Sequence, residues 1–208
     1  MNTITRLVLA GVAVLAASPL IFSVSATVGD AKIMKTVQTE TDKVAEAVGT
    51  GKKKDTIVSL TKSTVKKITA ADDEDYKWLN VMTLFSPRRR GGFGVGQKGE
   101  IEIDGIERKI RALTRGPLMA GQLKKESAAL IQMGYRTSAI AKISHAMPMK
   151  QDKNKREATA KWLKYAKSMD KASMNFVKAV KAKAPKMVQK AATAIDNSCN
   201  QCHKDFRL

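Results

Sequence analysis

Cysteine and histidine are scarce in this chain of 208 residues. There are only two of each, and Cys199, Cys202 and His203 stand together within the last ten residues. Outside that stretch the only further histidine or cysteine is His145, so a zinc site would lack its second pair of ligands. A structural disulfide elsewhere in the fold is excluded too, because both cysteines belong to one short motif.

Aromatic residues are also few, at 5%, whereas lysine and alanine recur throughout the chain. This composition suits helices better than sheets, so we expect an all-α protein. The length is sufficient for one domain with a proper core and a sizeable insertion. The low aromatic content and the lack of a recognition motif argue against nucleic acid as a partner.

The motif near the C-terminus has the form Cys-x-x-Cys-His, from Cys199 to His203. Two thiols three positions apart on a helix can each add to one vinyl group of the same haem, and the next residue can ligate the iron. A redox-active dithiol is the alternative, but that motif belongs at a helix start after a strand, and nothing strand-like precedes Cys199. The motif therefore predicts one covalently bound haem c per chain.

The N-terminus has the pattern of a secretory signal peptide. A short basic start, Met1–Arg6, precedes the mostly apolar stretch Leu7–Phe22, and small residues follow up to Ala26. An uncleaved membrane anchor is the alternative, but 16 residues are short for a bilayer span. We expect residues 1–26 to be removed after Ala26, leaving 27–208 as a single haem-binding helical domain in the periplasm or another exported compartment.

Apolar residues at intervals of three and four predict several long helices. The four longest stripes cover residues 31–48, 121–147, 154–183 and 185–206. They suggest an antiparallel four-helix bundle that holds the cofactor between facing helices, with the cysteines on the buried face of the last one. A further stripe over 55–70 either extends the first helix or packs separately.

Residues 71–120 break this pattern and are expected to form a largely irregular insertion or excursion. Short helices are predicted over 76–85 and 106–113, with a short extended piece over 101–103. The loop Arg88–Gly96 combines three arginines with four glycines. It is interpreted either as an anion-binding loop or, preferentially, as an exposed excursion; its glycine spacing does not fit a dinucleotide site.

The last helix resembles the class II c-type cytochromes, the cytochrome c′ family. The resemblance rests on Cys199, Cys202, His203 and Arg207, with a tryptophan-containing helix before them. It implies a haem inside a four-helix bundle, and members of this family often form homodimers. In low-spin members an axial methionine lies on the first helix in a Val-Met-Lys-like context, which Ile33-Met34-Lys35 resembles. The resemblance thus implies Met34 as the distal ligand.

The sixth iron ligand decides the function. A His203/Met34 pair suits an electron carrier, which is the expected role and not an enzymatic one. An open position would instead bind NO or CO, or give weak peroxidase activity. His145 and Met82 are the alternative distal ligands.

The charge is strongly positive, with 38 Lys and Arg against 19 Asp and Glu and a net charge of +19. From Lys150 to Leu208 alone there are 15 basic and five acidic residues. Charge of this size bears on partners and association rates and not on fold. It predicts acidic redox protein partners or an anionic membrane surface, the alternative being a solvated lysine-rich surface without a partner.

Overall fold

The computed structural model describes residues 31–71, 77–147 and 155–206, and within these ranges it contains helices and no strand. The predicted signal peptide, residues 1–26, lies outside them. The all-α prediction is confirmed. The elements are α1 (Ala31–Gly49), α2 (Lys54–Ala71), α3 (Lys77–Thr83), the 3₁₀ helix η1 (Arg88–Arg90), α4 (Ile106–Arg115), α5 (Ala120–Ala146), α6 (Lys155–Lys181) and α7 (Pro185–Phe206).

The helix predictions from periodicity hold to within one or two residues at most ends. The stripe over 55–70 forms a separate helix, α2, because the chain turns at Gly51 with a φ of 69° and folds back along α1. Pro185 is the first residue of α7, where its missing N–H costs no hydrogen bond. The extended piece predicted over 101–103 is wrong: these residues form bends.

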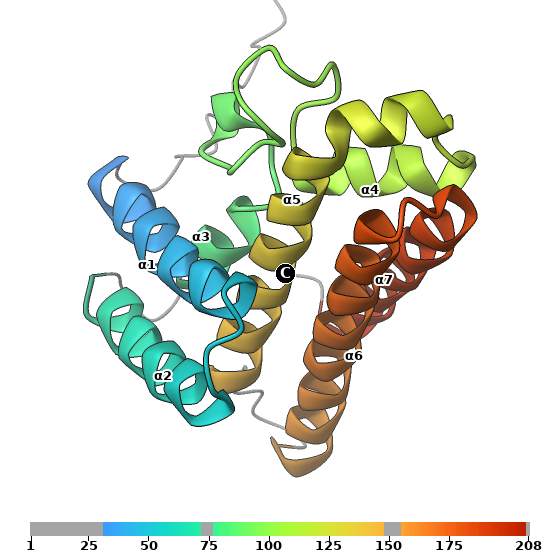
Figure 1. Ribbon diagram of the computed structural model, residues 1–208. Coiled ribbons are helices and arrows are strands. Elements are labelled where there is room, and N and C mark those ends of the chain that lie inside the picture. The colour runs from blue at the N-terminus through green and yellow to red at the C-terminus, as the bar shows by residue number, and fades with distance from the viewer. Residues whose placement is uncertain (1–30, 72–76, 148–154, 207–208) are drawn as a thin grey trace, which may run out of the picture.

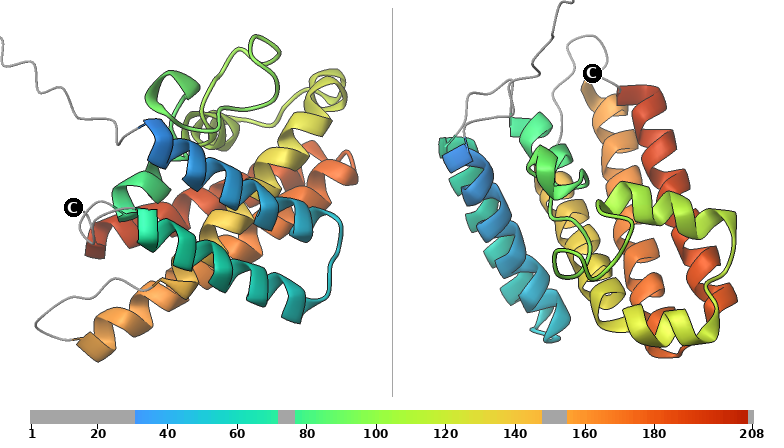
Figure 2. Two further views of the ribbon diagram at one scale, coloured as in Figure 1. Left: turned by 90° about the vertical axis from the view of Figure 1, so that its left-hand side faces the viewer. Right: turned by 90° about the horizontal axis from the view of Figure 1, so that it is seen from above.

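Helix α5 lies at the centre of the molecule (Figure 1). It packs against α1 and α2 on one side and against α6 on the other, and α6 in turn packs against α7. Seen from above, α1 and α2 form one pair and α6 and α7 another, with α5 between them (Figure 2). Within the described residues α1 and α7 do not pack along each other, and α4 packs on α7 instead.

The close packing of α5 on α6 depends on Gly134. A Cβ atom at this position would lie 2.5 Å from Cγ2 of Val177 and 3.2 Å from Cδ1 of Phe176. Phe176 is fully buried, and both neighbours belong to α6. The glycine therefore permits a helix approach that a larger residue would obstruct.

The segment between α2 and α5 is not peripheral to the core. Phe93, Val95 and Ile101 are buried, and so are Ile106 and Ile110 on α4. The expectation that the arginine- and glycine-rich loop is an exposed excursion is therefore wrong. Phe93 and Val95 alternate with glycines, and two apolar residues are too few for a pattern that predicts burial.

The loop from Arg88 to Gly96 is held by its own side chains. The guanidinium of Arg88 bonds to the Asp104 carboxylate at 2.6 Å and to the Gly96 carbonyl, and the Arg88 backbone N–H donates to Asp104 at 2.9 Å. Arg136 of α5 lies 4.3 Å above the ring of Phe93 and pairs with Asp42 of α1 at 2.8 Å. The Arg88 guanidinium is therefore occupied by contacts within the loop and is not available to bind an anion.

Helix α4 is tied to α5 by a buried ion pair. The ammonium of Lys109 lies 2.6 Å from the carboxylate of Glu126, and Lys109 is only 3% exposed. A buried charge must be paired, so this contact fixes where α4 can sit. None of the helices in the described ranges combines the length and the apolar run that crossing a membrane would need.

Candidate cofactor site at the C-terminal helix

Five helices enclose a cleft beside the Cys-x-x-Cys-His motif, called here the C-terminal cleft. Its space is about 810 Å³ when the open mouth is included, but the interior is narrow, about 100 Å³. The walls are largely apolar, with a few charged groups. The lining residues are Met82, Phe85, Glu107, Ile110, Arg111, Ser144, Trp162, Tyr165, Ala166, Met169, Asp196, Ser198, Cys199, Asn200, Cys202 and His203.

Helix α7 delivers the three motif residues to one wall of this cleft. Cys202 and His203 follow Cys199 by three and four positions, so all three residues lie on the same side of the helix. Both thiols are free and half-buried, whereas His203 is exposed near the helix end and still lines the cleft. The prediction that the two cysteines lie on the inward face of the last helix therefore agrees with their partial burial against the core.

Both thiols have raised pKa values. Burial raises the pKa of Cys199 to about 12, and the nearby Asp196 carboxylate adds to the effect. Burial also raises the pKa of Cys202 to about 11, with a contribution from Asp205. Reactive dithiols need thiolate at neutral pH, and these thiols remain protonated there. The environment thus disfavours the dithiol interpretation.

Residues between α2 and α5, the predicted insertion, also line the cleft. Met82 and Phe85 line the cleft from α3 and the residues just after it, and Ile110 lines it from α4. The helical spacing of Met82 and Phe85 is visible in the sequence. The sequence does not reveal that this short helix and the motif line the same cleft, because more than a hundred residues separate them along the chain.

Trp162, which lines the cleft, belongs to a cluster of aromatic rings. Trp162 of α6 stands edge-on to Trp78 of α3 at 4.6 Å and to Phe206 of α7 at 5.3 Å between ring centroids. Its indole N–H donates to the carbonyl of Ser144 on α5 at 2.7 Å. The ring cluster thereby joins four helices at one point and keeps Trp162 in a fixed orientation.

Charged and hydroxyl groups gather at the mouth. Arg111 of α4 pairs with Glu107 at 2.8 Å and lies 4.0 Å from Asp196 of α7. The hydroxyl of Tyr165 donates to the Asp205 carboxylate at 2.7 Å, and this hydrogen bond raises the pKa of Tyr165. Arg111 is therefore the cation that lines the cleft, a role that the sequence did not single out.

The predicted distal ligands do not all meet the motif. Met34 is buried in the main core at 4% exposure but does not line the C-terminal cleft, and His145 lines other clefts, on the side of α5 that faces α2 and at α6. Met82 does line it, and so does Met169, whose Sδ lies 3.9 Å from Sγ of Cys199. Arg207 lies outside the described residues.

No group of three or more His, Cys, Asp or Glu residues that could hold a metal ion occurs in the part of the chain that the structure describes. Comparison of the chain with models of protein families, with curated proteins and with solved structures found no match. The chemistry of the cleft therefore has to be argued from its own residues.

Proposed function

We propose that this chain is a monohaem c-type protein that carries electrons in an exported compartment. The observation that supports this most is the convergence of both motif thiols and His203 on one wall of a largely apolar cleft. Chance would place a Cys-x-x-Cys-His sequence on any helix face, including one directed at solvent. The cleft gives the motif a place in which an apolar cofactor leaves water.

The residues of the C-terminal cleft fit a haem by their chemistry. Cys199 and Cys202 would hold it through thioether bonds, each thiol adding its sulfur and its proton across one vinyl group. His203 would supply the proximal imidazole. Phe85, Ile110 and Trp162 would exclude water from the ring. The bound iron would supply one-electron redox chemistry.

The narrow interior of the cleft sets a condition on loading. With only about 100 Å³ inside, the walls must separate before a macrocycle enters. The wall carried by α3 is the element suited to move, because α3 has only seven residues, whereas α4 is held by the Lys109–Glu126 ion pair and packs on α7. Helices α1, α5, α6 and α7 would then form the four-helix bundle, with α3 and α4 closing the side between α1 and α7.

Met82 is the distal ligand that the geometry favours. It lines the cleft that carries His203, whereas Met34 does not. Met169 lies in contact with the Cys199 sulfur, and that sulfur would join the edge of the haem and not its centre. A thioether at Met82 would give a His/Met site with a raised potential, as an electron carrier requires. Met34 remains the ligand that the family resemblance implies.

A five-coordinate haem protein that binds NO or CO, or acts as a weak peroxidase, is the competing proposal. Peroxidase chemistry needs a distal base near the iron. His145, the only other histidine, does not line the C-terminal cleft. This favours the electron carrier.

The experiment is an optical spectrum of the exported protein in both redox states. The proposal predicts six-coordinate low-spin bands with a methionine–iron charge-transfer band, insensitive to CO. High-spin bands that shift when CO is added would contradict it and support the gas-binding alternative.

A further inference from the structure

A second cleft lies between α2, α5 and α6 and is called here the lysine cleft. It encloses about 1460 Å³ with its open mouth included. Among the described residues, five lysines line it and Asp170 is the only carboxylate that does. The lining lysines are Lys52, Lys54, Lys62, Lys142 and Lys167.

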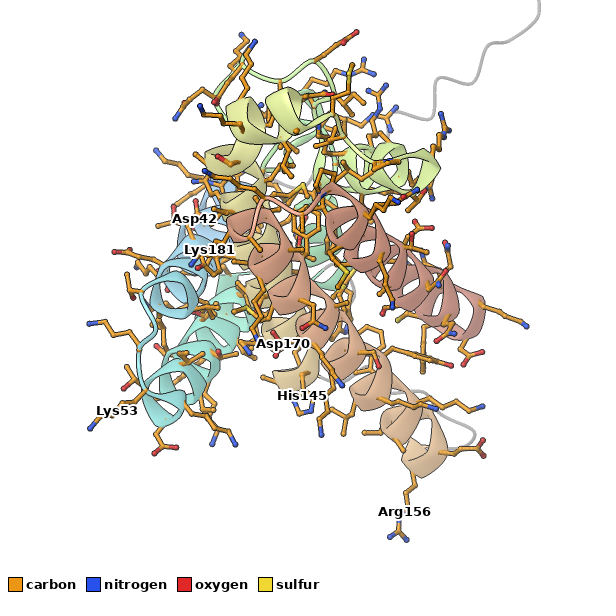
Figure 3. The ribbon with its side chains drawn as sticks, turned by 45° about the vertical axis from the view of Figure 1, so that its right-hand side comes forward. Asp42, Lys53, His145, Arg156, Asp170 and Lys181 are labelled. Atoms are coloured by element: carbon orange, nitrogen blue, oxygen red, sulfur yellow. The ribbon has the colours of Figure 1, made fainter. Side chains whose placement is uncertain are left out.

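The one carboxylate in the lysine cleft is already engaged. Asp170 of α6 accepts hydrogen bonds from Lys142 at 2.5 Å and from the Ser138 hydroxyl at 2.5 Å. It therefore neutralises Lys142 and leaves the cationic groups of the other four lysines facing the opening. Lys52 and Lys54 lie at or just before the start of α2, Lys62 lies in the middle of that helix, and Lys167 lines the cleft from α6. Figure 3 shows Asp170 close to His145 on this side of the molecule, with Lys53 at the turn before α2.

Apolar side chains also take part in the lining of the lysine cleft. Ile57 and Val58 of α2 and Ala141 and Ala166 of the neighbouring helices line it. Val58 is 43% exposed and is one of the few large hydrophobic residues on the described surface. A lining that combines lysines with apolar side chains suits a ligand that has carboxylates around an apolar side chain.

We propose that the lysine cleft is the docking site for an acidic, amphipathic segment of a partner protein, and that this partner exchanges electrons with the chain. The second part rests on the proposed function. Ala166 lines both the lysine cleft and the C-terminal cleft. A partner bound in the lysine cleft is therefore separated from the C-terminal cleft by helix α6 alone. The side chain between the two clefts is the small one of Ala166, and a short separation suits electron transfer.

The test uses the exported, haem-bearing chain and a labelled synthetic peptide that carries glutamates around leucines at helical spacing. Fluorescence anisotropy measures its binding, and the readout does not depend on haem. The cleft variant carries Lys52→Glu, Lys54→Glu and Lys62→Glu, which reverse the charge at three of the lining lysines. The matched control carries Lys178→Glu, Lys186→Glu and Lys190→Glu, which are exposed lysines near the end of α6 and the start of α7. Both variants change the net charge equally.

The proposal predicts that the cleft variant loses binding by about tenfold or more, while the control changes it by less than about threefold. Equal losses in both variants would overturn it, because they would indicate nonspecific charge attraction. It would also be overturned if the chain binds citrate or vesicles of anionic lipid through these lysines but not the peptide. Circular dichroism checks that each variant is folded.

Failure of this proposal and failure of the proposed function give different results. If the chain carries no haem yet binds the peptide through the cleft, the docking site stands and the electron-carrier role does not. If the haem spectrum is as predicted and the peptide does not distinguish the two variants, the electron-carrier role stands and the docking site does not.

Discussion

The environment of the two thiols makes a prediction about pH. Their raised pKa values mean that the fold favours the neutral thiols. In chain that carries no haem, this contribution to stability is fully present below pH 9, the ordinary value, and is lost as the pH rises toward about 12. Attachment to haem removes the titrating groups, so the exported form lacks this part of the pH dependence.

Alkylation by iodoacetamide measures the thiolate directly. At pH 9 the native haem-free chain should react far more slowly than the same chain in denaturant. The rate at Cys202 should rise near pH 11 and that at Cys199 near pH 12. Native thiols that react as fast as denatured ones at pH 9 would show that the motif lies outside the protected cleft.

The distal ligand is the second prediction at the level of single residues. Met82→Ala should remove the methionine–iron charge-transfer band and open the iron to CO, because Met82 lines the cleft and no other sulfur is proposed to reach the iron centre. Met34→Ala, which truncates a buried side chain elsewhere in the core, serves as the matched control and should keep the band. The opposite pattern would assign the ligand to Met34.

At the level of elements, the contact between α5 and α6 is the most sensitive to a single methyl group. Gly134→Ala should destabilise the protein by about 1–3 kcal/mol. The added Cβ would lie 2.5 Å from Cγ2 of Val177, and the short, branched valine side chain has little freedom to move away. Gly121→Ala, near the start of the same helix with nothing within 4 Å, should instead stabilise it by about 0.5–1 kcal/mol. Urea unfolding compares the two.

If Gly134→Ala matches Gly121→Ala in the free energy of unfolding, the two helices do not approach as closely as described. An unchanged optical spectrum in both variants would separate this packing effect from any effect on the cofactor.

The sequence predicted the long helices well because each has a continuous apolar stripe that its local periodicity reveals. It predicted the inward face of α7 for the same reason. It named Met82 only as one alternative ligand, and it did not predict that Phe93 and Val95 are buried or that Arg111 lines the C-terminal cleft. These placements depend on contacts such as Arg88 with Asp104, which no periodicity encodes. Whether residues 71–120 are an insertion relative to a family stays a prediction.

For the molecule as a whole, the net charge of +19 predicts rates that depend on salt. Oxidation of the reduced protein by ferricyanide, an anion, should slow by about threefold or more when the salt concentration rises from about 0.01 M to 0.2 M. Oxidation by a cationic cobalt(III) complex should accelerate over the same range. Stopped-flow absorbance gives both rates, and rates indifferent to salt would refute electrostatic steering.

The central claim is that Cys199 and Cys202 bind one haem covalently, and the intact mass of the exported chain tests it most directly. Covalent attachment predicts the mass of the chain cleaved after Ala26 plus one haem, with the haem retained after denaturation and acid extraction. The double variant Cys199→Ala, Cys202→Ala should lose that added mass. A wild-type chain with the mass of the polypeptide alone, and with two thiols open to alkylation after denaturation, would contradict the account.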